Sequence, residues 1–245
     1  MKAWTGASSP SVLRRSTSPR RKATSRSQLA SIASMTRRRS SAIALARLPF
    51  RPMRALAAIA LLVLAGCGGG SDEPARERGD LDRQLIEAAF ANDVEAARRL
   101  VAQGADVNAK DVTRQSAYLI ATSEVGDDPR LLELTLAGGA RVDDKDSYDG
   151  TGLIRAAERG HPRIVRRLLE AGIDRDHVNR LGWTALLEAI VLGDGGADHV
   201  ATVRALVRGG VDVAVPDGDG VTALEHAEER GFDRIARILR THPGA

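Results

Sequence analysis

Internal repetition constrains the fold of this chain more than any other feature. Five segments begin with an apolar residue that is followed three positions later by alanine, and their first residues lie 33, 35, 33 and 38 positions apart. A unit of this length is one supersecondary element that buries its apolar face only against a neighbouring unit, so the units stack around one continuous core. The five segments begin at Leu85, Tyr118, Leu153, Leu186 and Leu224.

Each unit contains the pattern of two short helices. A serine or threonine such as Thr184 precedes the first helix, where its hydroxyl can accept a hydrogen bond from a free backbone N–H group. In the third unit Ile164, Leu168 and Leu169 have the spacing of one apolar face of a second helix. Gly172 follows and can adopt the left-handed conformation that ends a helix. The sequence therefore predicts a series of helix-turn-helix units.

The motifs of these units resemble the ankyrin repeat. Residues 182–186 (Gly-Trp-Thr-Ala-Leu) are similar to the start of that repeat, Gly160-His161 to its middle and residues 104–108 (Gly-Ala-Asp-Val-Asn) to its end. The resemblance covers residues 81–240. It implies an all-α fold, an ankyrin-repeat solenoid of about five helix-turn-helix repeats with short β-hairpin loops.

The chain departs from the ankyrin pattern at the Thr-Pro-Leu-His motif. Proline is missing from every copy, and the histidine, which in the family ties neighbouring repeats by hydrogen bonds, is replaced each time. We therefore expect apolar packing to take over from that polar network. The replacing residues are Ile86, Leu119, Ile154, Leu187 and Glu225.

A short apolar run lies before the repeats. Residues 55–65 are apolar and follow Arg51 and Arg54. A membrane-spanning helix needs about 20 apolar residues, so this run is too short to span and has instead the form of a secretory signal peptide. It ends in Leu64-Ala65-Gly66-Cys67, which resembles the bacterial lipobox. The resemblance implies that Cys67 carries a lipid and is the first residue of the mature chain.

These features divide the chain into five parts. Residues 1–52 form an Arg- and Ser-rich leader that we expect to be disordered, with a mis-assigned start: the true start is either Met35 or Met53. Residues 53–66 are the predicted lipoprotein signal peptide, and residues 67–80 the lipidated cysteine with a flexible linker. Residues 81–240 are the predicted ankyrin-repeat domain, and residues 241–245 a C-terminal tail.

Charge and cysteine content narrow the possible functions. The first 71 residues contain 13 basic and no acidic residues, whereas the remainder contains 23 basic and 32 acidic ones. An acidic domain cannot neutralise phosphates, so no nucleic-acid partner is expected. Cys67 is the sole cysteine, and no metal-ligand spacing, phosphate-binding loop or nucleophile motif occurs. We expect a protein that is not an enzyme and has no metal, cofactor or small-molecule substrate.

The ankyrin resemblance implies that a protein partner binds the concave face, which loop tips and first helices form. We expect a monomer in the periplasm that is attached to the membrane only through its lipid anchor. Because Gly68 follows Cys67, we expect that membrane to be the outer membrane. The alternatives are a secreted ankyrin effector acting in another cell, which a lipidated Cys67 disfavours, and a structural envelope protein. The predicted contact residues are Trp183 as the leading anchor, with Lys110, Asp111, Lys145, Asp146, Arg159, Arg180, Asp217, Asp219 and Arg230. The alternative for Trp183 is that its ring lies over the neighbouring hairpin and has only a packing role.

Overall fold

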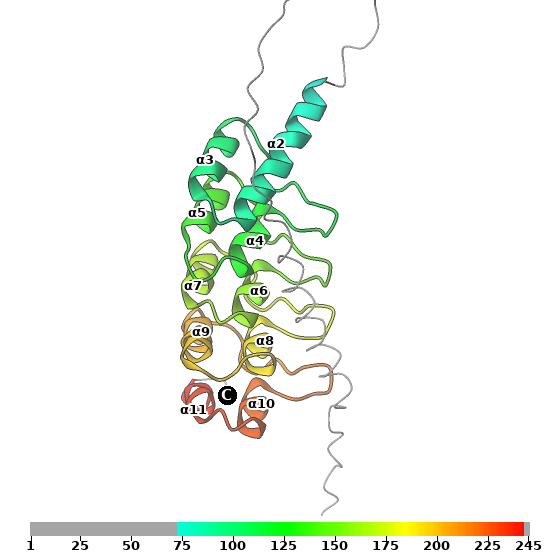
Figure 1. Cartoon of the computed structure of the whole chain (residues 1–245). Helices are drawn as coiled ribbons and strands as arrows, with labels where there is room; N and C mark the ends of the chain where they lie inside the picture. The colour runs from blue at the N-terminus through cyan, green and yellow to red at the C-terminus, as the bar shows by residue number, and fades with distance from the viewer. Residues whose placement is uncertain (1–72, 243–245) are drawn as a thin grey trace, which may run out of the picture. The chain divides into compact units, whose positions relative to one another are not determined.

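The computed structural model describes residues 73–242, which fold into ten helices taken in pairs along the chain. The first helix of each pair lies in an inner column and the second in an outer column (Figure 1). The pairs are α2 (Glu73–Phe90) with α3 (Val94–Ala102), α4 (Ala117–Ser123) with α5 (Arg130–Ala137), α6 (Gly152–Glu158) with α7 (Pro162–Glu170), α8 (Ala185–Val191) with α9 (Ala197–Arg208), and α10 (Ala223–Glu229) with α11 (Asp233–Arg240).

The core runs between the two columns as one continuous layer. Small alanines such as Ala156 and Ala189 are fully buried on the inner helices, and leucines such as Leu131 and Leu168 are fully buried on the outer helices. Each helix pair contacts the next, α6 with α8 and α7 with α9, so no pair has a core of its own. The solenoid of about five helix-turn-helix repeats is confirmed.

The inner helices begin as the sequence predicts. Ser116, Thr151, Thr184 and Thr222 are the N-cap residues of α4, α6, α8 and α10, and each side chain accepts a hydrogen bond from the backbone N–H three residues later. Glycines follow the outer helices with positive φ, for example 81° at Gly172 and 78° at Gly210. These glycines provide the left-handed conformation that ends a helix.

The loops between repeats are tight turns rather than regular hairpins. Within residues 73–242 there is no strand, and the isolated bridge found there pairs Lys145 with Thr151. Each loop folds around one Asp or Asn side chain, which accepts hydrogen bonds from the backbone N–H groups two and four residues later. These acceptors are Asp111, Asp146, Asn179 and Asp217.

Two expectations are corrected. Helix α2 begins at Glu73, so residues 73–80, expected as flexible linker, are helical. Pro74 lies in the first turn, where proline is tolerated, and Arg83 pairs with Asp80 at 3.0 Å. The second expectation was that apolar packing replaces polar contacts between repeats. Hydrogen bonds nevertheless join neighbouring repeats, because the backbone N–H of Asp174 donates to Asp143 Oδ1 and that of Asp212 donates to Asp176 Oδ1.

The predictions for the leader lie outside the described residues. They concern residues 1–52, the signal peptide at 53–66 and the lipidated Cys67. Within the part of the chain that the structure describes, no helix has the length and apolar character needed to cross a membrane.

Candidate functional site

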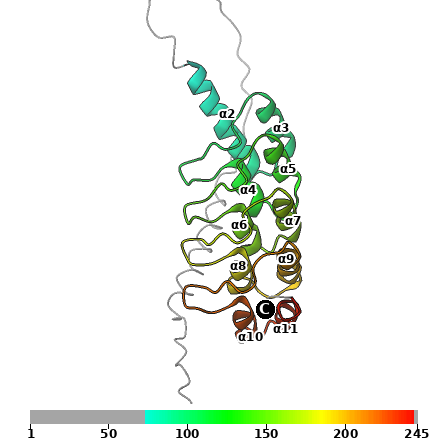
Figure 2. The same ribbon diagram turned by 180° about the vertical axis from the view of Figure 1, so that it is seen from behind.

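Four stacked loops project from the inner helices along one side of the solenoid (Figures 1 and 2). We call their tips, residues 112–114, 147–149, 180–182 and 218–220, the loop-tip ridge. Each tip contains a residue with positive φ: Arg114, Asp149, Gly182 or Gly220. The repeated turn geometry gives every tip the same backbone, so the tips differ in their side chains.

Apolar side chains are exposed on this ridge and beside it. Val112 is fully exposed, and Leu181 is 41% exposed. Val178, just before the third turn, is 43% exposed. None of these three residues is among the contact residues predicted from the sequence. Val112 and Val178 are each next to a turn-forming Asp or Asn, and Leu181 lies two residues after Asn179, so the position of the turn was the available signal.

Two predicted contact residues tie neighbouring loops together. Lys110 Nζ lies 2.8 Å from Asp144 Oδ1 and donates to the backbone carbonyl of Lys145 at 2.7 Å. Arg180 Nη1 donates to the carbonyl of Ser147 at 3.0 Å. These bonds cross from one repeat to the next and hold the tips in register. Lys110 and Arg180 therefore stabilise the ridge.

The loop carboxylates were expected to contact a partner, and the structure assigns them another role. Asp146 is 7% exposed and Asp217 is 9% exposed. Asp146 accepts from Arg155, and Asp217 Oδ2 lies 2.7 Å from His226 Nε2, in addition to their turn hydrogen bonds. Asp111 likewise accepts from Thr113 within its own turn. The buried carboxylates of Asp146 and Asp217 need these donors, and half-buried Asp111 is held in the same way, so the three residues shape the loops.

Trp183 was expected to project beside the loop tip as the leading anchor. The structure shows the residue 7% exposed, so the expected projection is wrong and the alternative of a packed ring agrees with the burial. Its backbone N–H donates to Asn179 Oδ1, and its carbonyl accepts from the Asn179 N–H. The side chain is therefore buried within the solenoid. No contact with a partner is needed to explain the residue.

The remaining predicted residues lie at the ends of the inner helices or in the loops. Arg159 Nη2 is 3.8 Å from Glu124 Oε1, and Arg230 donates to the carbonyl of Gly193 while lying over the Phe232 ring. Both arginines reach toward the preceding repeat. Lys145 lies 3.5 Å from Asp149 Oδ1. Asp219 is exposed at its tip, and its carboxylate makes no hydrogen bond within residues 73–242.

The ionisable side chains of the repeats contact one another and the backbone, and these contacts stabilise the fold. His199 Nδ1 lies 2.8 Å from Asp194 Oδ1, and its Nε2 lies 3.1 Å from the carbonyl of Glu158. Such pairs join the two helices of a repeat or neighbouring repeats. In the range from 73 to 242, no group of three or more His, Cys, Asp or Glu side chains is placed to hold a metal ion.

Comparisons with known proteins agree with this architecture. A family model described as ankyrin repeats in three copies matches residues 118–198 and 153–245, and a single-repeat model matches residues 85–112. The chain is 40% identical over 141 residues to the ankyrin repeat protein YahD of Escherichia coli (strain K12), a match covering 57% of this chain and 69% of that protein. It is 32% identical over 144 residues to the human Ankyrin repeat and SOCS box protein 6, of which it spans 34%.

The solved structures that this chain resembles are also ankyrin-repeat proteins. An ankyrin repeat domain from Acinetobacter baumannii AYE is 44% identical, with a TM-score of 0.60, over 64% of this chain and 80% of that one. The ankyrin repeat protein EF0377 is 34% identical, with a TM-score of 0.61, over 65% and 80% of the two chains. The family models match only the repeats, a fold that generally serves as a non-enzymatic scaffold for protein–protein interaction. This chain belongs to the ankyrin-repeat family.

Proposed function

We propose that the loop-tip ridge is the surface through which this ankyrin-repeat protein binds its partner. The observation that carries the proposal is the full exposure of Val112 on a loop whose backbone is held by its own hydrogen bonds. Leu181 extends the apolar surface two repeats further along the ridge. Apolar side chains on a rigid frame bind with little loss of conformational entropy.

The shape of the ridge favours a protein over a small molecule. Small-molecule sites are concave and enclose most of the ligand. The tips instead form an extended row of convex turns with separate apolar points at Val112 and Leu181 and a free carboxylate at Asp219. A stable protein interface buries about 800 Å² on each partner, which several adjacent tips can supply together.

Site-specific photocrosslinking in the cells that make the protein tests this proposal. The photoreactive residue benzoylphenylalanine replaces Val112 or Leu181 in the full chain, and Arg98, which is exposed on outer helix α3, in the control. We expect a shared crosslinked partner from the two ridge positions and none from position 98. A partner captured equally well from all three positions, or only from position 98, would exclude the ridge.

We further propose that the protein is a lipoprotein of the periplasm, anchored through Cys67. The support is the sequence Leu64-Ala65-Gly66-Cys67 after an apolar run and two arginines. A clickable fatty-acid analogue should label the wild type and leave Cys67→Ser unlabelled. Label that persists in Cys67→Ser would reject the anchor. Recovery of unlabelled protein in the culture medium would support the secreted effector instead.

A further inference from the structure

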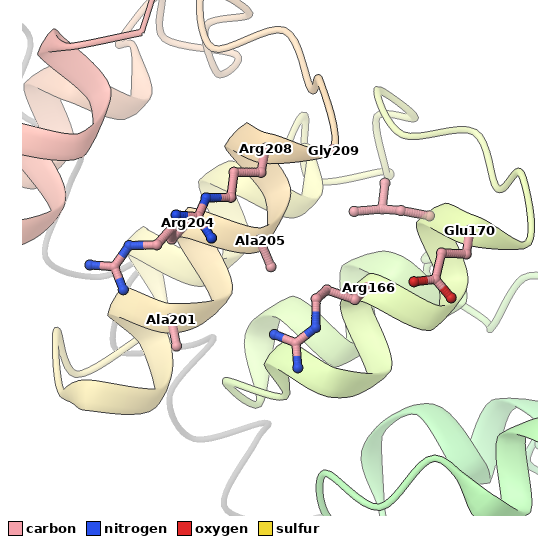
Figure 3. A pocket seen from close by; sticks show the side chains of 8 residues that line it. Arg166, Glu170, Ala201, Arg204, Ala205, Arg208 and Gly209 are labelled. Atoms are coloured by element: carbon pink, nitrogen blue, oxygen red, sulfur yellow. The ribbon is translucent and has the colours of Figure 1, made fainter.

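A second surface lies on the outer column, away from the ridge. It is a groove of about 340 Å³ between α7 and α9 (Figure 3). Arg166 and Glu170 line it from α7, and Arg204 and Arg208 line it from α9. The loop tips project from the opposite, inner column, so this groove is separate from the proposed partner site (Figures 1 and 2).

Small residues on α9 create the groove. Ala201 and Ala205 lie one helical turn apart where larger side chains would fill the space, and Leu169 provides an apolar floor from α7. Gly209 follows α9, and a Cβ atom there would lie 2.5 Å from Leu169 Cδ1. Glycine at this position therefore leaves Leu169 in place.

Three arginines surround this apolar floor without partners. Arg166, Arg204 and Arg208 are exposed, and none makes an ion pair or side-chain hydrogen bond within residues 73–242. One acidic side chain, Glu170, lines the groove beside them, so its lining carries a net positive charge. Beyond residue 71 the chain contains 32 acidic and 23 basic residues, so the groove is basic on an acidic domain.

We propose that this groove binds an acidic peptide segment of a partner protein, as a second interface in addition to the ridge. Arginine pairs with carboxylates through two parallel hydrogen bonds, and Arg204 and Arg208 are about 6 Å apart along the helix axis. That spacing matches two carboxylates along one segment, with a leucine of the segment over Leu169 and Ala205. The recessed apolar floor accepts a side chain, whereas a membrane surface presents a broad layer of headgroups.

Fluorescence anisotropy with the full chain tests the groove. The probe is a fluorescein-labelled peptide of glutamate, leucine and alanine with glutamates four positions apart, and the matched peptide has lysine in place of glutamate. We expect the glutamate peptide to bind, and to weaken as salt increases because the pairs are exposed. Arg204→Glu with Arg208→Glu should weaken binding at least about tenfold, which corresponds to about 1.4 kcal/mol.

The control variant is Arg98→Glu. Arg98 has the same register on α3 as Arg166 on α7 and is also exposed, but it lies outside the groove. It should bind the glutamate peptide as the wild type does, and the double variant should gain affinity for the lysine peptide. Equal loss in Arg98→Glu would overturn the proposal.

Two further outcomes would assign the groove to another occupant. The first outcome is that the wild type binds no peptide but binds vesicles containing phosphatidylglycerol, and that the double variant does not bind these vesicles. This would overturn the proposal in favour of a lipid surface. A dimer in sedimentation that Arg204→Glu with Arg208→Glu abolishes would overturn it in favour of a second copy of the chain. Neither outcome alters the crosslinking test of the ridge, which uses other residues.

Discussion

Two neighbouring boundaries of the solenoid carry different side chains at one equivalent position. They are the boundary between the second and third repeats and the boundary between the third and fourth. Arg155 on α6 and Glu188 on α8 both follow the Leu-Ile or Leu-Leu pair of their repeat, and both are buried, at 3% and 4% exposure. Each reaches back to the Asp or Asn of its own loop, Arg155 to Asp146 and Glu188 to Asn179. The same backbone thus holds a buried cation at one boundary and a buried acid at the next.

The surroundings of the two side chains are not equally complementary. Arg155 donates to Asp146 Oδ2, to Gln115 Oε1, and to Ser123 Oγ at 2.7 Å. Glu188 accepts from Asn179 Nδ2 at 2.7 Å, while its Oε2 is buried without a hydrogen-bond partner among the described residues. Burial, with the nearby charge of Glu158, raises the pKa of Glu188 to about 8. Apolar packing is shared by the two boundaries, and among the described residues the buried charge is paired with an opposite charge at the first boundary but not at the second.

The largest effect should be the same at both boundaries. Ala156 and Ala189 follow Arg155 and Glu188 directly, and both are fully buried. Ala156→Trp and Ala189→Trp should each lower the free energy of unfolding by about 3 kcal/mol or more, because the close helix contact cannot hold an indole ring. Chemical denaturation followed by circular dichroism measures this loss. Tolerance of tryptophan at one of the two positions would show that the packing is not shared.

Loss of the buried cation should have an effect of comparable size, at the first boundary alone. Arg155→Ala leaves the Asp146 carboxylate buried without its charged partner, and this kind of change costs about 3–5 kcal/mol. Arg166→Ala on the exposed face of α7 is the control and should stay within about 0.5 kcal/mol of the wild type. If Arg155→Ala changed the free energy of unfolding as little as the control does, the polar network would not stabilise the first boundary.

Glu188 should make the stability depend on pH. The pKa of Glu188 is raised in the folded state, so above the ordinary carboxyl range the folded chain keeps a proton that the unfolded chain has released. The free energy of unfolding should therefore fall as the pH rises from about 5 to about 8. At about 1.4 kcal/mol per pKa unit, the loss is on the order of a few kcal/mol. Denaturation midpoints across this pH range measure it.

Glu188→Gln provides the control for that slope. Glutamine can still accept the Asn179 hydrogen bond and has no charge to bury, so the fall should disappear. Burial lowers the pKa of His161 below its ordinary value of 6.5, which makes stability rise with pH below about 6.5, and the variant retains that opposite trend. A fall of unchanged size in Glu188→Gln would show that another group causes it.

The sequence predicted the repeat order, the helix caps and the glycine ends because these depend on residues close together in the chain. The two boundaries could not be predicted in this way. The partners of Arg155 include Ser123 and Gln115, which lie 32 and 40 residues away. The burial of Trp183 likewise depends on how its loop closes, and a tryptophan beside a turn is equally compatible with an exposed anchor. Local motifs specify the unit, and the contacts between units give each side chain its role.

The helix caps should give the smallest effect and the most uniform one. Thr151 accepts from Ile154 N at 3.4 Å and Thr184 accepts from Leu187 N at 3.3 Å, so the two N-caps are built alike. Thr151→Ala and Thr184→Ala should each lower the free energy of unfolding by about 1 kcal/mol, and Thr→Ser at either position should restore most of it. Denaturation at about pH 5 and about pH 8 should give the same decrement for both variants, because neither cap contains an ionisable side chain. A decrement at Thr184 that grows with pH while that at Thr151 stays constant would mean that the charge on Glu188 reaches the cap of its own helix, and the difference between the boundaries would then extend beyond the buried pair.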